Sequence, residues 1–477
     1  MNPAPSAITV CAILAATAVS AGVTGLVLRT STGVGIDSPD ERRKSHPAPV
    51  PRLGGLPIFI TLICGFIFAS WRNPDYWQHW RPVIITCTII FIVGFVDDLR
   101  PLGARAKLLG QLGAACILYA FGVSIDEISN PFGDSTLSLG FWGFPLTILW
   151  LIAIPNIINL IDGMDGLATG FGLFLCVTLG FVGHVNGRPE VVFIAAVMSG
   201  ALAGFLIFNY PPARIFLGDG GAYLIGFFIA STSLVSATKG SIMAALLVMI
   251  VALGVPILDT FFAIARRALR GVPIFRADAE HIHHRLILLG FSKTKALIAL
   301  YSVSVALSLI GISIFISRGL ALPMAGAALC LLALVAARYL GYVKSWTMLR
   351  KQVQSAMERR RDMLFTHDCG RVAEWEAERC ASADEFVREL RHLLERVGLQ
   401  ISASGQTRAL PLQIDPQITC RLHHIPDSDS PQSQERWLAK ADAFLPALTR
   451  AVERWGIFPG LDIQGSSRNG QDHPGPS

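Results

Sequence analysis

Charged residues are scarce in this sequence. Of its 477 residues, only 16% are Asp, Glu, Lys or Arg, and 52% are hydrophobic. A soluble protein of this length would carry more charge, so the composition indicates a membrane protein. The formal net charge of +6 is not a nucleic-acid signal, because Lys and Arg fall in short loops between apolar runs. We therefore expect a lipid bilayer as a partner and no nucleic acid.

Cysteine pairs and zinc motifs are also missing. The nine cysteines form no CxxC pair, and no HExxH spacing accompanies the histidines. We therefore expect neither disulfides nor a zinc–thiolate site. The apolar segment 7–28 has no preceding Lys or Arg. Because it lacks the basic start of a signal peptide, we expect it to be a retained membrane span.

Long apolar runs fill the first 344 residues. A membrane helix needs about 20 mostly apolar residues. Candidate runs lie near residues 7–28, 53–70, 82–96, 106–123, 141–158, 167–184, 190–209, 220–236, 241–263, 296–316 and 320–342. This pattern predicts an all-α polytopic membrane protein with about eleven transmembrane helices, and a transmembrane domain over residues 1–344.

The loops between these runs differ in charge. With the N-terminus outside, most loop Lys and Arg residues fall on the cytoplasmic side, which is the usual positive-inside bias. The opposite loops carry only Arg72, Arg81, Arg188, Lys239 and Arg318. The bias predicts a multi-pass membrane protein with an external N-terminus and a cytoplasmic C-terminus.

The sequence changes character after the last apolar run. Residues 345–460 predict a small cytoplasmic α/β extension, with helices over 345–364, 384–397 and 433–455 and a strand pair before the third helix. Residues 461–477 are rich in Gly, Ser and Pro, and we expect a disordered tail. No catalytic pattern is visible in the extension, and its role stays open.

Four polar clusters interrupt the apolar region. They are Asp97-Asp98, Asn159 to Gly166, Phe216 to Gly221, and His281 to Arg285. The charge bias puts all four on the cytoplasmic side. A charged side chain at the centre of a membrane helix costs about 2.5–3.5 kcal/mol, so such residues are functional candidates.

Each cluster also has a structural alternative. The first could be a solvated turn, the second a polar helix end, and the third an N-cap formed by Asp219. The fourth could be a basic loop that binds anionic headgroups, and Lys107 could simply extend to the membrane surface. Together, however, carboxylates suited to Mg²⁺ and phosphate-binding Lys, Arg and His indicate phosphoryl-type transfer. The donor would be a soluble diphosphate and the acceptor a lipid phosphate.

These motifs, in this order, resemble the polyprenyl-phosphate N-acetylhexosamine-1-phosphate transferase family, glycosyltransferase family 4. Besides the four clusters, the resemblance includes Arg43 to His46 and Pro51 to Gly55, and it spans roughly residues 36–290. It implies that a lipid phosphate attacks the β-phosphorus of a UDP-sugar and releases UMP.

The resemblance implies a role for each matching residue. Asp219 is the expected principal ligand of Mg²⁺, or alternatively Mn²⁺, with Asp98 in support. Asp97 is expected to orient or deprotonate the lipid phosphate. The expected catalytic set is Asp97, Asp98, Asp162, Asp165, His281, His283, His284 and Arg285. The expected substrate contacts are Lys44, His46, Lys107, Asn159 and Arg266.

Two departures favour one branch of the family. Arg100 follows the paired acids where the muramyl-pentapeptide branch has lysine, and the histidine cluster reads His-Ile-His-His-Arg-Leu. We therefore expect UDP-GlcNAc as donor and undecaprenyl phosphate as acceptor, at the start of a cell-envelope polysaccharide such as the lipopolysaccharide O-antigen. Another UDP-N-acetyl deoxyhexosamine, or a polytopic transporter, is the alternative. A homodimer is also possible.

Overall fold

The computed structural model describes most of the chain. It covers residues 5–30, 36–37, 50–129, 136–236, 242–270, 281–317, 322–339, 346–397, 409–415, 418–423, 440, 442–455 and 463–465. The chain divides into two compact units. The first is Met1–Arg267 with Pro273–Lys344, and the second is Ala268–Val272 with Ser345–Ser477.

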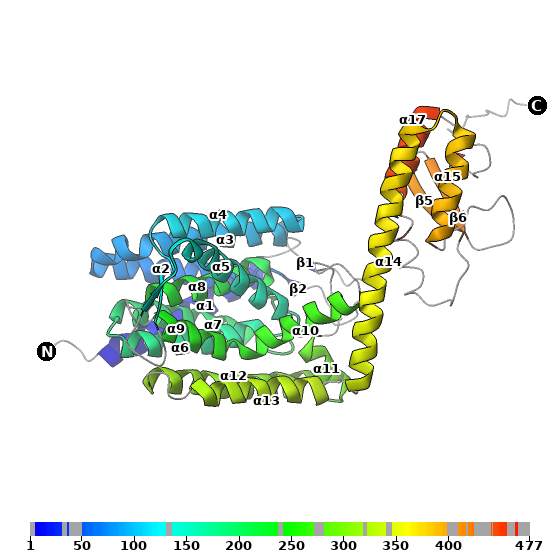
Figure 1. The fold of residues 1–477 in the computed structure, drawn as a ribbon. Helices are drawn as coiled ribbons and strands as arrows, with labels where there is room; N and C mark the ends of the chain where they lie inside the picture. Colours follow the sequence, from blue (N-terminus) through cyan, green and yellow to red (C-terminus); the bar gives the residue numbers. More distant parts are fainter. Residues whose placement is uncertain are drawn as a thin grey trace, which may run out of the picture. The chain divides into compact units, whose positions relative to one another are not determined.

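The first unit is a bundle of helices that run side by side (Figure 1). Its helices are α1 (Pro5–Thr30), α2 (Gly55–Arg72), α3 (Asp75–Leu99), α4 (Ala104–Ala120), α5 (Gly143–Ile161), α6 (Leu167–Val185), α7 (Pro189–Asn209), α8 (Gly218–Ser236), α9 (Ile242–Ala252), α10 (Gly254–Arg270), α11 (Ile282–Leu288), α12 (Lys293–Ile316) and α13 (Leu322–Tyr339). Residues 268–270, at the end of α10, are assigned to the second unit. A short 3₁₀ turn, Gly140–Trp142, precedes α5.

The helices satisfy their own polar groups, as a lipid environment requires. Several hydroxyl groups inside them donate to the carbonyl one turn earlier, for example Thr61 to Pro57 at 2.8 Å and Ser231 to Phe227 at 2.6 Å. These bonds remove the cost of placing a hydroxyl in an apolar interior. Apolar segments containing scattered Ser and Thr can therefore remain continuous helices.

Seven described helices are long and apolar enough to cross a membrane: α1, α2, α3, α5, α6, α7 and α12. An eighth span results if Leu246–Ala252 and Gly254–Ala265, bent by 68° at a break, are counted together. The protein is thus a multi-pass, mainly α-helical membrane protein. Each of the predicted apolar runs contains a helix, but the count of eleven spans is not confirmed and stays a prediction.

Helix α8 lies at the centre of the bundle, and nearly all of its residues are buried. Its first turn meets α2 and α3 without intervening side chains. A methyl group at Gly94 of α3 would lie 2.6 Å from the carbonyl oxygen of Asp219, and one at Gly55 of α2 would collide with the backbone of Gly221. Only glycine allows backbones to approach this closely.

Short strands join the helices of the first unit. Strand β1 (Ile36–Asp37) pairs antiparallel with β2 (Val50–Pro51), with Ile36 opposite Pro51, and β3 (Glu127–Ser129) pairs with β4 (Thr136–Ser138). The segment after β2 is fixed to the start of α8. The Phe216 N–H donates to the Pro51 carbonyl, and the Gly54 N–H donates to the Phe216 carbonyl, both at 2.9 Å.

The second unit contains α14 (Trp346–Arg379), α15 (Ala383–Arg396) and α17 (Leu445–Trp455). It also has an antiparallel sheet in the order β5 (Ala409–Asp415), β6 (Ile418–His423), β7 (Ile463–Gly465). The described core consists of Phe386, Leu390, Phe444, Leu448 and their neighbours on the three helices. Its cytoplasmic location stays a prediction.

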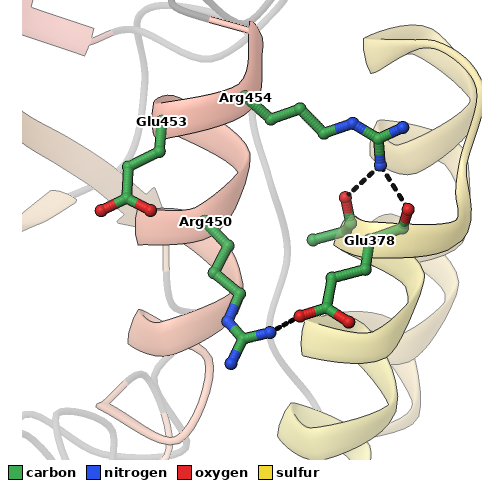
Figure 2. A pocket seen from close by; sticks show the side chains of 5 residues that line it. Glu378, Arg450, Glu453 and Arg454 are labelled. Carbon is green, nitrogen blue, oxygen red and sulfur yellow. Dashed lines mark hydrogen bonds and ion pairs between the residues drawn. The ribbon is translucent and has the colours of Figure 1, made fainter.

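A pocket between α14 and α17 is lined by Ala377, Glu378, Arg450, Glu453 and Arg454 (Figure 2). Arg450 pairs with Glu374 at 2.8 Å and with Glu378, and Arg454 donates to the Ala377 carbonyl at 2.9 Å. Half-exposed ion pairs of this kind contribute little stability, about 0–1 kcal/mol each. The arrangement joins the two helices and has no catalytic pattern.

Candidate active site

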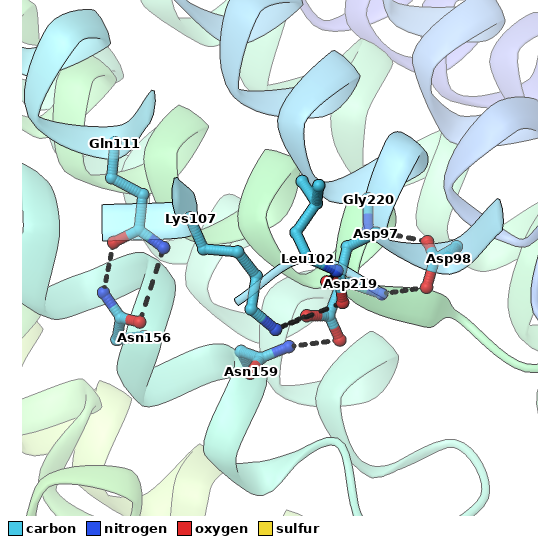
Figure 3. A network of polar contacts seen from close by, with 9 residues as sticks. All are labelled: Asp97, Asp98, Leu102, Lys107, Gln111, Asn156, Asn159, Asp219 and Gly220. Carbon is cyan, nitrogen blue, oxygen red and sulfur yellow. Dashed lines mark hydrogen bonds and ion pairs between the residues drawn. The ribbon is translucent and has the colours of Figure 1, made fainter. Parts of the chain in front are cut away.

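Three of the four polar clusters converge on Lys107 and Asp219. Lys107 extends from the first turn of α4, and its Nζ lies 3.1 Å from Asp97 Oδ2 and 3.0 Å from Asp219 Oδ2 (Figure 3). Asn159, near the end of α5, donates from Nδ2 to Asp219 Oδ1 at 3.0 Å. Asp97 Oδ1 also accepts from the Leu102 N–H at 2.7 Å, which fixes the turn between α3 and α4. Two carboxylates and an ammonium group therefore share one site.

Asp98 has a different environment from its neighbour. Its two carboxylate oxygens accept from the N–H groups of Asp219 and Gly220, at 2.8 and 2.9 Å. These are otherwise unsatisfied donors at the start of α8, so Asp98 caps that helix from another helix. Gly218 has φ +75°, and a methyl group there would lie 2.6 Å from Asp98 Oδ2. Asp98 thus caps α8, which leaves the side chain of Asp219 directed towards Lys107.

The loop after α5 is anchored by two helices that approach it. Gly166, with φ +77°, donates from its N–H to Asn209 Oδ1 at 3.1 Å, and its carbonyl accepts from the Tyr301 hydroxyl at 2.6 Å. Asp165 is 6% exposed, and its Oδ2 accepts from the Ala213 N–H at 3.2 Å. Residues on α7 and α12, and the loop before α8, therefore fix this turn.

Asp162 stands at the C-terminal end of α5, outside the apolar helix. Burial raises the pKa of its carboxyl group well above the usual range, the charges of Asp219 and Asp98 raise it further, and Arg52 opposes them. Burial therefore favours the protonated form of this carboxyl group, and that form can donate a hydrogen bond. In that form, Asp162 can contact a hydrogen-bond acceptor on a ligand.

Asp259 of α10 contacts the first two residues of the histidine cluster. Its Oδ2 lies 3.1 Å from His281 Nδ1, and its Oδ1 accepts from the Ile282 N–H at 2.9 Å. From the sequence, Arg266 is a candidate partner of Asp259. In the structure its described partners are His281 and Ile282, while the Arg266 side chain lies outside the described residues. A carboxylate that caps α11 and binds the preceding imidazole restrains both.

His283 joins the histidine cluster to the loop after α5. It is 2% exposed, its ring is parallel to that of His281 at 5.8 Å, and a methyl group at Gly163 would lie 2.8 Å from its Nε2. Burial, followed by the charge of His284, lowers the pKa of His283 to about 3. A neutral imidazole offers a hydrogen bond and no positive charge. Among the described residues, its Nε2 has no hydrogen-bond partner.

The structure describes the remaining expected site residues only in part. The His284 ring lies 4.2 Å from the His283 ring, measured between centroids. Lys44 and His46 lie outside the described residues, and His284 and Arg285 are half-buried on α11. Four contacts near the site are not predicted from the sequence. They involve Gln111, Asn209, Tyr301 and the pairing of Asp259 with His281. Only Gln111 had a sequence signal, since it follows Lys107 by one helical turn.

The carboxylates of Asp97 and Asp219 are suitable ligands for Mg²⁺, but they would fill only part of its coordination shell. In the described part of the chain, no group of three or more His, Cys, Asp or Glu side chains is arranged to hold a metal ion. Mg²⁺ commonly takes one or two carboxylates and completes its shell with water and substrate phosphates. The neighbouring carboxylates of Asp219 and Asp97, linked through Lys107, satisfy that requirement.

The chain is similar to known membrane transferases. Residues 80–237 match the model of glycosyl transferase family 4. A probable undecaprenyl-phosphate N-acetylglucosaminyl 1-phosphate transferase of Bacillus subtilis (strain 168) is 36% identical over 287 residues, which are 60% of this chain and 79% of the relative. A decaprenyl-phosphate N-acetylglucosaminephosphotransferase of Mycobacterium tuberculosis (strain ATCC 25618 / H37Rv) is 32% identical, over 58% of this chain and 75% of the relative.

Another relative comes from a different branch. A phospho-N-acetylmuramoyl-pentapeptide-transferase of Halalkalibacterium halodurans is 27% identical, over 57% of this chain and 86% of the relative. The family resemblance drawn from the motifs is confirmed, including the preference for the N-acetylglucosamine branch. The carboxylates, lysine and histidines described above thus form the polar centre of a membrane enzyme, and the chain belongs to glycosyl transferase family 4, the polyprenyl-phosphate sugar-1-phosphate transferases.

Proposed function

We propose that the protein transfers N-acetylglucosamine-1-phosphate from UDP-GlcNAc to undecaprenyl phosphate. An oxygen of the lipid phosphate forms a bond to the β-phosphorus, the bond from that phosphorus to the bridging oxygen breaks, and UMP leaves with the electron pair. The observation that carries the proposal is the convergence of Asp97, Lys107, Asn159 and Asp219 at one end of an apolar bundle. The name of the Bacillus subtilis relative supports undecaprenyl phosphate as the acceptor, and the names of both transferases support an N-acetylglucosamine phosphate as the transferred group.

The central physical problem of this reaction is that two anions must meet. Lys107 supplies a fixed positive charge between two carboxylates, within 3.1 Å of both. Such preorganised charge stabilises the transition state of phosphoryl transfer more than the separated reactants. We assign Lys107 to the diphosphate, together with Arg285, His281 and His284 of the histidine cluster.

Asp219 is the proposed principal ligand of Mg²⁺ or Mn²⁺, with Asp97 beside it and Asp98 orienting the start of α8. When bound, the ion would neutralise phosphate charge. Asp97 is assigned to the lipid phosphate. A phosphate with its second pKa at about 6 is largely a dianion at neutral pH, so Asp97 needs only to orient it.

The loop from Asp162 to Gly166 is assigned to the nucleotide. Burial raises the pKa of Asp162 and so favours its protonated form, which can donate to a carbonyl or phosphate oxygen. Asp165 supports the loop through Ala213. Asn159 links this loop to the metal-binding side through its bond to Asp219. Lys44, His46 and Arg266 remain proposed substrate contacts.

The proposed topology follows the loop charges. The site faces the cytoplasm of a bacterial inner membrane, where UDP-sugars are made, and about eleven spans put the N-terminus in the periplasm and the α/β extension in the cytoplasm. The product would start a cell-envelope polysaccharide such as the O-antigen, and the protein could act as a homodimer.

A direct assay tests the proposal. Protein purified in detergent is mixed with undecaprenyl phosphate, MgCl₂ and each member of a panel of UDP-sugars, and UMP release is measured. We expect release that depends on both lipid and Mg²⁺ and is fastest with UDP-GlcNAc. Faster release with a UDP-N-acetyl deoxyhexosamine would change the donor, and no release with any UDP-sugar would refute the transferase proposal.

The same assay tests the role of Asp219. We expect Asp219→Asn to lower kcat by about 100-fold or more, because an amide cannot hold the cation or balance Lys107 in the same way. The control is Asp75→Asn, at the opposite end of α3 and distant from the site. Equal activity of the two variants would contradict the assignment of Asp219 as metal ligand.

A further inference from the structure

Gln111 and Asn156 form a reciprocal amide pair one helical turn inside the site. Asn156 Nδ2 donates to Gln111 Oε1 at 2.6 Å, and Gln111 Nε2 donates to Asn156 Oδ1 at 3.4 Å (Figure 3). Gln111 is 1% exposed, and Asn156 also donates to the carbonyl of Ile152 at 2.8 Å. The proposed reaction uses neither amide, although both are costly to bury in an apolar bundle.

The pair lies directly behind two donors of the site. On α4, Gln111 follows Lys107 by four residues, and on α5, Asn156 precedes Asn159 by three. Each amide therefore shares a helix face with one donor. Lys107 Nζ lies 3.0 Å from Asp219 Oδ2, and Asn159 Nδ2 lies 3.0 Å from Asp219 Oδ1. Helices α4 and α5 thus meet through polar groups twice, at the amide pair and at Asp219.

Helix α4 needs such a restraint more than α5 does. Helix α5 is held against α8 where Gly226 meets the backbone of Pro155, a contact that leaves no space for a side chain. Between α4 and α5, the aromatic edge contact of Tyr119 with Phe144, at 4.9 Å between ring centroids, lies at the far end of α4. Apolar contacts tolerate sliding, whereas a two-way amide hydrogen bond is satisfied in one register.

We infer that Gln111 and Asn156 are positioning residues: their amide pair fixes the register of α4 on α5, so that Lys107 and Asn159 reach the two oxygens of Asp219. The kinetic part of this inference rests on the proposed transferase function. In an apolar helix interface, water does not readily replace a lost amide partner. Removing one amide therefore lets α4 shift and moves the Lys107 ammonium group away from Asp219.

The first test compares three variants in the UMP-release assay, normalised to folded protein by size-exclusion chromatography. We expect Gln111→Leu to lower kcat by roughly 10- to 100-fold, because an error of about 1 Å in a reacting group has that effect. The KM for UDP-GlcNAc should change less than kcat. The exchanged pair, Gln111→Asn with Asn156→Gln, keeps both amides and should recover most of the activity. The control Tyr119→Leu loosens the same helix pair at its far end and should keep kcat.

The second test does not depend on catalysis. A water-soluble amine-acylating reagent labels Lys107 at a rate that mass spectrometry measures, with Lys293 as internal reference. We expect faster labelling of Lys107 in Gln111→Leu, and wild-type rates in the exchanged pair and in Tyr119→Leu. Wild-type kcat and labelling in Gln111→Leu, or no recovery by the exchanged pair, would overturn the inference. If the wild type releases no UMP, the proposed function fails, and the labelling still decides the role of the amide pair.

Discussion

Asp97 and Asp98 are adjacent in the sequence but have different partners. Asp97 contacts Lys107, whereas Asp98 accepts two backbone N–H groups of α8. The sequence identifies both as functional candidates because acids at a membrane helix end are costly. It cannot distinguish them, because the partner of each residue lies on another helix. For the same reason, the sequence leaves Asp219 as an equally plausible N-cap, and the cap is in fact Asp98.

His283 gives a prediction at the same scale. Its pKa is lowered to about 3 by burial, then by His284 and His281, while Asp259 acts in the opposite direction. The unfolded chain has an ordinary histidine pKa of about 6.5. Between these values the unfolded state binds the extra proton, so the stability contributed by neutral His283 is fully present above about pH 6.5 and falls as the pH is lowered, by up to about 1.4 kcal/mol per pH unit.

Thermal unfolding in detergent between pH 7.5 and 5 measures this effect. We expect His283→Gln to have a flatter dependence of Tm on pH than the wild type. His184→Gln serves as the control, because His184 is exposed at the end of α6. If His283→Gln and the wild type lose Tm in parallel, buried neutral His283 is not the source of the acid sensitivity.

At the scale of elements, the sequence predicts helices better than their ends. Helix α15 spans Ala383–Arg396, one residue from the expected 384–397. Helix α14 continues to Arg379, beyond the expected end at 364, and passes through Gly370. That glycine is explained by tertiary packing, because a methyl group there would collide with the carbonyl of Ala443. Such contacts between distant segments are not visible in local sequence.

The junction of α3 with α8 gives the next prediction. We expect Gly94→Ala to destabilise the protein by about 1–3 kcal/mol, because the added methyl group would lie 2.6 Å from the Asp219 carbonyl and force the helices apart. It should also lower the rate of UMP release, since Asp219 begins α8. Thermal unfolding and the transferase assay measure the two effects.

Gly113→Ala is the matched control for that substitution. Gly113 lies on α4 with nothing within 4 Å of the added carbon. Because alanine favours a helix over glycine by up to about 1 kcal/mol, this variant should be neutral or slightly more stable. Equal destabilisation by both substitutions would show that the crossing of α3 and α8 is not the sensitive point.

At the scale of the whole molecule, the described site residues all belong to the first unit. The second unit has its own core on α14, α15 and α17. We therefore expect a fragment of residues 345–477 to fold alone and to give a cooperative circular-dichroism melt. Residues 1–344 should keep UMP release. A fragment without a cooperative melt, or an inactive residue 1–344 protein that is well folded, would show that the units depend on each other.

The convergence of the polar clusters is also a property of the whole molecule. Loop charges alone predict that the clusters share one membrane face, because Lys and Arg bias the orientation of membrane helices strongly. The actual pairs could not be predicted, since Lys107 reaches Asp219 across 112 positions of sequence. The packing of α4, α5 and α8 decides which groups meet.

The cap on α8 affects which groups can neutralise the negative charge of a bound diphosphate. A free helix start is a natural cradle for phosphate, but here Asp98 already fills it with the chain's own anion. The N–H groups of Asp219 and Gly220 are therefore not available to bind an incoming diphosphate. Under the proposed function, the counter-charge comes from Lys107, which its two carboxylate partners hold in place, and from a bound divalent cation. We therefore expect the turnover rate to depend on the concentration of divalent ions at the membrane surface.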